Sequence, residues 1–202
     1  MVLKSIERNV SNNLQLSIQM AVMEDTRAIS SVLAKSFYEF PEFANWIYPF
    51  LQFTINEDLR YRLRSHSPNY SCLVAKLVEP PSSDRQPESN QAIVATAELT
   101  LRSASFWSSE PQHPYISNLA VKHDYRCLGI GSQLLTKCEE IALDWGYMET
   151  RLHVLDRNES AKRLYCRNGY QITQIENNWG NLWFDCSPRL LLKKHILVQE
   201  SA

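Results

Sequence analysis

One segment of the chain joins a strand, a glycine-containing turn and a helix, and it restricts the possible folds more than any other. Tyr115 to Val121 predicts a strand, and after seven intervening residues Gly129-Ile130-Gly131 leads into a helix that ends near Trp145. Apolar side chains recur along one stripe of that helix. Arg151 to Leu155 predicts the next strand, so residues 115–155 predict a β-α-β unit.

The turn before this helix has the features of a diphosphate-binding site. The first N–H groups of a helix lack intrahelical partners, and the helix dipole adds positive potential there. Gly129 and Gly131 let a ligand approach the backbone without meeting a Cβ atom, and Arg126 lies at the base of the loop. The formal net charge is only −1, so such an anion site must be local. The same charge balance gives no indication of nucleic acid or an anionic membrane as a partner.

Two other nucleotide-binding patterns do not fit this turn. A P-loop requires Gly-x-x-x-x-Gly-Lys-Ser/Thr, which the sequence lacks. A Rossmann fingerprint requires a third glycine where Leu134 stands, although Asp156 follows the next strand as its acidic residue would. The Rossmann turn also places its first glycine almost directly after the strand, whereas seven residues separate Val121 from Gly129. The spacing therefore excludes that interpretation.

The rest of the sequence predicts an α/β fold with a mixed sheet. A composition of 44% hydrophobic and 21% charged residues is typical of a globular protein with a real core. Residues 1–13 are expected to be a loose lead-in and 14–197 a single domain. The aromatic segment Phe37 to Phe50 contains two prolines and is predicted to be a bent helix-turn-helix. Further strands are predicted at 14–20, 71–78, 92–101, 170–175, 182–184 and 190–192, and further helices at 24–37, 55–64 and 159–166.

The cysteines predict reduced thiols in an intracellular protein. The five are scattered, and none forms a pair or cluster with metal-ligand spacing, so no metal site is expected. No secretory signal and no run of about 18 apolar residues is visible, which predicts a cytoplasmic protein. The cysteines are Cys72, Cys127, Cys138, Cys166 and Cys186.

Two motifs give the chain a resemblance to the Gcn5-related N-acetyltransferases (GNAT). The family's pyrophosphate-binding pattern, Arg/Gln-x-x-Gly-x-Gly/Ala after a strand ending in Leu/Ile-Ala-Val, is matched between Leu119 and Leu135. A second pattern, with Asn, Ala, Leu-Tyr and Gly-Phe/Tyr at fixed spacing, is matched from Asn158 to Tyr170. The resemblance extends more loosely over residues 14–192. It implies a mixed, mostly antiparallel sheet with a central V-shaped splay, flanked by helices.

The resemblance implies acetyl-CoA as co-substrate, without deciding between an acetyl and a longer acyl group. The main chain of Leu119, Ala120 and Val121 would pair with the pantetheine arm, because a bulge splays this strand from its neighbour at 151–155. Asn158 would hydrogen-bond the same arm. The pyrophosphate would contact Arg126 and the backbone amides of the turn, which comprises Cys127, Leu128, Gly129, Ile130, Gly131 and Ser132.

The same resemblance places Tyr165 near the thioester sulfur. Amine attack expels a thiolate, and a phenol with a pKa of about 10 can donate a proton to it. The alternative is a tyrosine that merely packs the short helix. His153 stands where several relatives carry a catalytic glutamate, and an imidazole pKa of about 6.5 suits a general base. A lone strand histidine can also be structural, so Glu98 is the second candidate for the base, followed by His113 and Glu110.

Cys127 and Cys166 suggest an alternative route through an acetyl-cysteine intermediate. Nothing in the sequence shows a general base next to either thiol. The resemblance instead favours direct attack by the amine in a ternary complex.

The acceptor amine is the least defined part of the prediction. The segment 37–50 lies where the family builds the acceptor side of its groove, and its aromatic residues could line a pocket or pack a core. It lacks the acidic cluster that a polyamine or an aminoglycoside would favour. Residues 187–194 resemble the plastid and cyanobacterial branch, whose members acetylate protein N-termini and lysine side chains. Protein α-amino or lysine ε-amino groups are therefore expected; the alternatives are a small amine or a non-catalytic acetyl-CoA-binding module.

Overall fold

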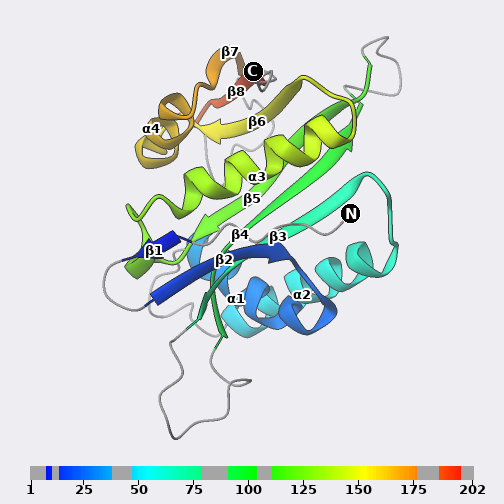
Figure 1. The fold of residues 1–202 in the computed structure, drawn as a ribbon, viewed down its shortest axis with the longest axis vertical. Coiled ribbons are helices and arrows are strands. Elements are labelled where there is room, and N and C mark those ends of the chain that lie inside the picture. The colour runs from blue at the N-terminus through cyan, green and yellow to red at the C-terminus, as the bar shows by residue number, and fades with distance from the viewer. Residues whose placement is uncertain are drawn as a thin grey trace, which may run out of the picture. The chain divides into compact units, whose positions relative to one another are not determined.

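The computed structural model describes residues 8–10, 14–37, 47–78, 91–103, 111–176 and 187–196 (Figure 1). The chain divides into two compact units, here called the N-terminal and the C-terminal unit. The N-terminal unit comprises Met1–Glu98 and Asn118–Leu134, and the C-terminal unit comprises Leu99–Ser117 and Leu135–Ala202. The units are interleaved along the chain because three elements contribute to both: β4 (Gln91–Arg102), β5 (His113–Val121) and α3 (Ile130–Asp144).

The strands of the N-terminal unit are hydrogen-bonded in the order β1-β2-β3-β4-β5. β2 (Leu14–Met20) pairs antiparallel with β1 (Arg8–Val10) on one side and β3 (Tyr70–Val78) on the other. The prediction for β2 is confirmed residue for residue. By contrast, β1 lies inside the segment for which no regular element was expected, and three residues are too few to show a hydrophobic period.

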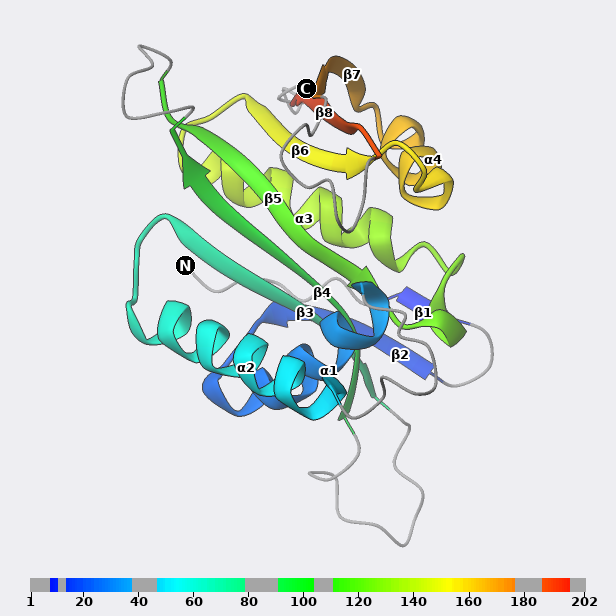
Figure 2. The same ribbon diagram turned by 180° about the vertical axis from the view of Figure 1, so that it is seen from behind.

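Two helices complete the N-terminal unit, and they lie side by side in both views (Figures 1 and 2). α1 (Thr26–Phe37) follows a short 3₁₀ turn, and α2 (Tyr48–Arg64) runs back beside it. Their apolar faces are buried together with residues from three strands, as the period of α1 predicts. The cluster consists of Ile29, Val32, Leu33, Leu59, Cys72, Val74, Ile93 and Ala120.

The start of α2 differs from the prediction. The sequence placed its beginning near Ile55 because Pro49 was interpreted as a break, but the helix begins at Tyr48. Pro49 lies in its first turn, where a missing N–H costs no intrahelical hydrogen bond. The remainder of the predicted bent segment, 38–46, lies outside the described residues.

The C-terminal unit contains strands in the order β4-β5-β6-β8-β7. β6 (Glu149–Leu155) pairs parallel with β5 and antiparallel with β8 (Arg189–His195), which also pairs antiparallel with β7 (Gln171–Glu176). β8 is longer than the three-residue piece expected at 190–192, and the strand expected at 182–184 lies outside the described residues. These strand pairings establish the mixed, mostly antiparallel sheet that the resemblance implied.

Two helices belong wholly or largely to the C-terminal unit, namely α3 and α4 (Glu159–Arg167). α3 ends at Asp144, and Gly146 just beyond it terminates the helix as predicted, with a φ of 85° in the left-handed conformation that glycine adopts easily. Its N–H donates to the carbonyl of Leu143 at 2.8 Å. Within the described part of the chain, no helix is long and apolar enough to cross a membrane.

Candidate active site

The turn for which the sequence predicts phosphate binding lies in the N-terminal unit, immediately before α3. Cys127 and Gly129 both have left-handed backbones, with φ of 63° and 78°. The carbonyl of Gly129 accepts from the N–H of Gln133 at 3.1 Å, so this glycine opens the first turn of the helix. A Cβ atom built on Gly129 would meet nothing within 4 Å. The turn therefore offers open space above backbone amides at a helix N-terminus, which fits a phosphate group.

Side-chain contacts tie this turn to the end of β5. Nε of Arg126 donates to the carbonyl of Val121 at 3.1 Å, which uses one of the five N–H groups of the guanidinium. Arg126 and the following Cys127, Leu128 and Gly129 are exposed, whereas Ile130 is buried. The charged end of Arg126 is thus held beside the turn and remains accessible to an anion.

β5 contains a residue with a left-handed backbone, Asn118, in the strand that the resemblance implied to be splayed from β6. Asn118 has a φ of 51°, although it lies in the middle of a strand. The ladder between β5 and β6 consists of two pairs, Tyr115 with Arg151 and Ile116 with Leu152, and ends there. A left-handed residue two positions after the last pair turns the backbone away from the regular extended conformation. The main chain of 119–121, the predicted partner of the pantetheine arm, follows directly.

Tyr165 lies in the C-terminal unit on α4, and its ring is almost completely buried. It contacts Tyr170 edge to face, with 6.0 Å between ring centroids. Burial raises the pKa of Tyr165 to about 12, and the neighbouring Tyr115 and Cys138 add to the shift. This phenol is protonated at neutral pH, so its O–H is available for the predicted donor role, and the raised pKa makes it a weaker acid than an exposed tyrosine.

His153 lies on β6, and its two ring nitrogens each have a partner. Nδ1 lies 2.8 Å from the hydroxyl of Tyr115, and Nε2 lies 3.1 Å from Oε1 of Glu176. A carboxylate can only accept, so in the neutral imidazole Nε2 carries the proton and Nδ1 accepts from Tyr115. The guanidinium carbon of Arg102 lies 3.7 Å from the centroid of the Tyr115 ring. These side chains form a connected chain of hydrogen bonds, which we call the acid–base chain: Tyr115, His153 and Glu176.

Sequence reasoning identified His153 but missed Tyr115 and Glu176. They lie 38 and 23 residues from His153, and only the registers of β5, β6, β8 and β7 bring them to it. One signal was available. Tyr115 and His153 both stand on strands of the predicted β-α-β unit, so a polar pair across these neighbouring strands was a testable expectation.

Glu98, the second candidate for the base, has a different environment. Its side chain is fully buried in the N-terminal unit; Oε1 accepts from Nδ2 of Asn118 at 2.9 Å, and Oε2 pairs with Nη1 of Arg62. Both carboxylate oxygens are therefore engaged. Of the weaker candidates, His113 is the first residue of β5, and Glu110 lies outside the described residues.

Asn158 serves as the N-cap of α4. Its Oδ1 accepts from the N–H of Ala161 at 3.1 Å, so only its exposed Nδ2 could donate to a cofactor arm. The cysteines Cys127 and Cys166 are both exposed free thiols. Among the described residues, no group of His, Cys, Asp and Glu could hold a metal ion.

Comparison with known proteins identifies the family. Residues 37–170 match the sequence model of the acetyltransferase (GNAT) family. The chain belongs to this family. As a member of it, the protein is an N-acetyltransferase whose co-substrate is acetyl-CoA. The open glycine turn at the start of α3 is consistent with that donor.

Several GNAT relatives and solved structures are similar to the chain. GCN5-related N-acetyltransferase 10, chloroplastic, of Arabidopsis thaliana is 25% identical over 177 residues, which cover 85% of this chain and 68% of that protein. Thialysine N-epsilon-acetyltransferase of Bos taurus is 35% identical over 123 residues, covering 61% of this chain and 68% of that protein. The N-acetyltransferase from Staphylococcus aureus Mu50 has a TM-score of 0.65 at 19% identity, covering 89% of this chain and 98% of that one. PaiA N-acetyltransferase from Thermoplasma acidophilum, in complex with coenzyme A, has a TM-score of 0.62 at 19% identity, with the same coverage. These structural likenesses show the GNAT fold.

Proposed function

We propose that this GNAT protein transfers an acetyl group to amino groups of proteins or peptides, either N-terminal α-amino or lysine ε-amino groups, by direct attack in a ternary complex. The observation that carries the acceptor class is the charge of α1 and α2, because the family resemblance assigns the acceptor side to the first two helices. An acceptor with several positive charges would need carboxylates there that are not already neutralised.

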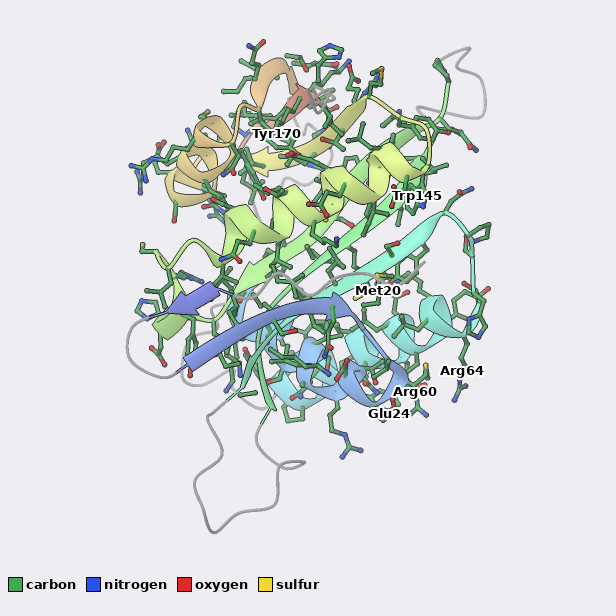
Figure 3. The ribbon with its side chains drawn as sticks, in the orientation of Figure 1. Met20, Glu24, Arg60, Arg64, Trp145 and Tyr170 are labelled. Atoms are coloured by element: carbon green, nitrogen blue, oxygen red, sulfur yellow. The ribbon has the colours of Figure 1, made fainter. Side chains whose placement is uncertain are left out.

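The carboxylates of α2 are neutralised within the helix. Glu57 lies 3.5 Å from Arg60, and Asp58 pairs with Arg62 one turn further on. Arg64 projects from the end of the helix into solvent (Figure 3). α1 contains no carboxylate. The two helices together carry five cationic side chains and two carboxylates, and one of the cations, Arg62, also pairs with the buried Glu98 of β4. The cations are Arg27, Lys35, Arg60, Arg62 and Arg64. This charge disfavours a polyamine or an aminoglycoside and is compatible with a peptide.

The acid–base chain supplies a route for the proton of the attacking amine. In this proposal Tyr115 accepts that proton at its phenol oxygen while its own hydrogen passes to Nδ1 of His153. Nε2–H of His153 remains hydrogen-bonded to Glu176, whose negative charge stabilises the imidazolium that forms. The imidazole is thus the proton acceptor, and Tyr115 connects it to the amine.

Tyr165 is the proposed proton donor to the leaving sulfur. Acetyl-CoA, when bound, supplies an activated acetyl thioester. The backbone amides of 127–132 and the guanidinium of Arg126 would hold its pyrophosphate, and the main chain of 119–121 and Nδ2 of Asn158 would hold its arm. Tyr165, which is protonated at neutral pH, would donate its O–H to the sulfur as the thiolate departs.

A second candidate acceptor is a small molecule that carries a lysine-like side chain. The similarity to thialysine N-epsilon-acetyltransferase of Bos taurus favours it. Such an amino acid has its own carboxylate beside its ammonium groups, so the cationic helices would not repel it as strongly as a polyamine.

Three sets of acceptors distinguish these possibilities by mass spectrometry after incubation with acetyl-CoA. The first contains peptides with a free N-terminus and no lysine, the second N-terminally blocked peptides with one lysine, and the third free lysine, thialysine and spermidine. The proposal expects acetylation in the first or second set, and its near loss in Tyr165→Phe but not in the control Tyr147→Phe. Acetylation confined to the third set would contradict a protein acceptor, and CoA binding without any turnover would indicate a non-catalytic module.

A further inference from the structure

A buried charge in the N-terminal unit joins α2, β4 and β5, and the acetyl-transfer scheme above does not use it. Glu98 on β4 has no exposed surface, and it contacts Arg62 of α2 through one oxygen and Asn118 of β5 through the other. The side chain of Arg62 is itself largely covered and packs near the ring of Tyr70, 5.9 Å from its centroid. The three residues Arg62, Glu98 and Asn118 are here called the β5 anchor.

The contact to Asn118 holds the one residue of β5 that has an unusual backbone. A φ of 51° is unfavourable for a residue with a Cβ atom, and asparagine is among the few that adopt it without large strain. A left-handed residue in a strand can relax to the regular extended conformation unless its neighbours prevent it. Nδ2 of Asn118 donates to a buried carboxylate at 2.9 Å, and this charge-assisted hydrogen bond holds the side chain in place.

The position of Asn118 gives this contact a consequence for the cofactor. The β5–β6 ladder ends at Ile116 and Leu152, and Asn118 with its left-handed backbone follows two residues later. If Asn118 became extended, the main chain of 119–121 would turn, and its N–H and C=O groups would change direction.

We propose that Glu98 is a positioning residue which, supported by Arg62, holds Asn118 in its left-handed conformation and thereby presents the main chain of 119–121 to CoA. This inference rests on the proposed mode of cofactor binding. Glu98 is then not the general base, because both of its oxygens are engaged and it has no exposed surface. Arg62 supplies the charge that a buried carboxylate requires, since burial raises the pKa of Glu98 and the contacts to Arg62 and Asn118 oppose that shift.

Isothermal titration calorimetry with CoA, which carries no acetyl group to transfer, measures cofactor affinity separately from catalysis. Asn118→Gly accepts the left-handed φ but removes the amide, and Glu98→Ala removes the acceptor. Each should weaken CoA binding about tenfold, with kcat at saturating acetyl-CoA changed much less. Glu98→Gln keeps an oxygen that can accept from Asn118, so it should bind CoA more tightly than Glu98→Ala.

Thr96→Val provides the matched control. Thr96 lies on the same strand, is buried and donates to the carbonyl of Leu73 at 3.0 Å, but it is not part of the β5 anchor. Its loss should lower the melting temperature and leave CoA affinity unchanged.

Two results would overturn the inference. One is a large fall in kcat for Glu98→Gln with unchanged CoA affinity, which would make Glu98 the base. The other is normal CoA binding by folded Asn118→Gly and Glu98→Ala, which would show that the β5 anchor only stabilises the fold. Failure of the wild-type protein itself to bind CoA would instead refute the proposed mode of cofactor use.

Discussion

The hydroxyl of Tyr115 lies 2.8 Å from Nδ1 of His153, so side chains of β5 and β6 are hydrogen-bonded beside the two backbone pairs at which these strands meet. The carboxylate of Glu176 is hydrogen-bonded to the other ring nitrogen, Nε2. An imidazole fixed at both nitrogens cannot turn toward a substrate without breaking a contact. A proton that reaches it must therefore come through Tyr115 or replace one of these hydrogen bonds.

Tyr115→Phe tests this route. The substitution keeps the ring and its packing under Arg102 but removes the hydroxyl, so kcat/KM for the amine should fall by about 10²-fold or more. CoA affinity should stay within about twofold of the wild type, because the change removes no proposed cofactor contact. Steady-state kinetics and CoA titration measure the two effects. If Tyr115→Phe were fully active while His153→Ala was inactive, His153 would accept the proton directly or through water.

Gly129→Asp and Gly129→Asn form a matched pair at the phosphate-binding turn. Both residues tolerate the left-handed backbone better than other non-glycine residues, and they differ mainly in charge. The carboxylate would face the diphosphate, so CoA should bind to the Asp variant at least about tenfold more weakly than to the Asn variant at low salt. Raising the ionic strength should reduce the difference in CoA affinity between the two variants. Equal affinities of the two variants would place the diphosphate elsewhere.

Substitutions at Asn158 separate helix capping from cofactor binding. Asn158→Ala should destabilise the protein by about 1 kcal/mol, because the N–H of Ala161 loses its acceptor. Asn158→Asp keeps a good cap and loses only the Nδ2 donor. If that donor holds the cofactor arm, the Asp variant should melt like the wild type but bind CoA more weakly. Wild-type affinity in Asn158→Asp would leave this residue a structural role alone.

The raised pKa of Tyr165 predicts how stability depends on alkaline pH. In the unfolded chain this phenol ionises near its ordinary value of about 10, whereas in the folded protein burial raises the pKa to about 12. The resulting contribution to stability is complete below pH 10 and is lost as the pH rises toward 12. Wild type should therefore lose about 1 kcal/mol more than Tyr165→Phe between pH 8 and pH 11. Urea unfolding at the two pH values measures this difference, and identical losses would show that the phenol is not buried as described.

Much of this fold could be predicted because it depends on local pattern. The alternation of β2 and the apolar stripe of α3 gave their positions to within a residue or so. The start of α2 could not be predicted in the same way. A proline breaks the interior of a helix but is tolerated in the first turn, where Pro49 lies. Ile47 at the N-cap makes no side-chain hydrogen bond, so no capping residue marked the start of the helix.

The candidate site was predictable only where residues belong to sequence motifs. Gly129, Tyr165 and His153 were identified through local strings or their place in the predicted unit. The partners that define what these residues can do come from distant segments. Likewise, Glu98 lies in a strand that is buried on both faces, and nothing local indicated that Arg62, 36 residues earlier, would reach it from α2.

The short strand β1 has a consequence for any shortened form of the protein. It occupies one hydrogen-bonding edge of β2, with Arg8 opposite Leu16 and Val10 opposite Leu14. A chain that began at Leu14 would keep the phosphate-binding turn and the acid–base chain, yet it would present that edge, with its free N–H and C=O groups, to strands of other molecules. Such a shortened enzyme should be active when dilute and should aggregate as its concentration rises. The three residues of β1 would therefore prevent self-association by covering the edge of β2.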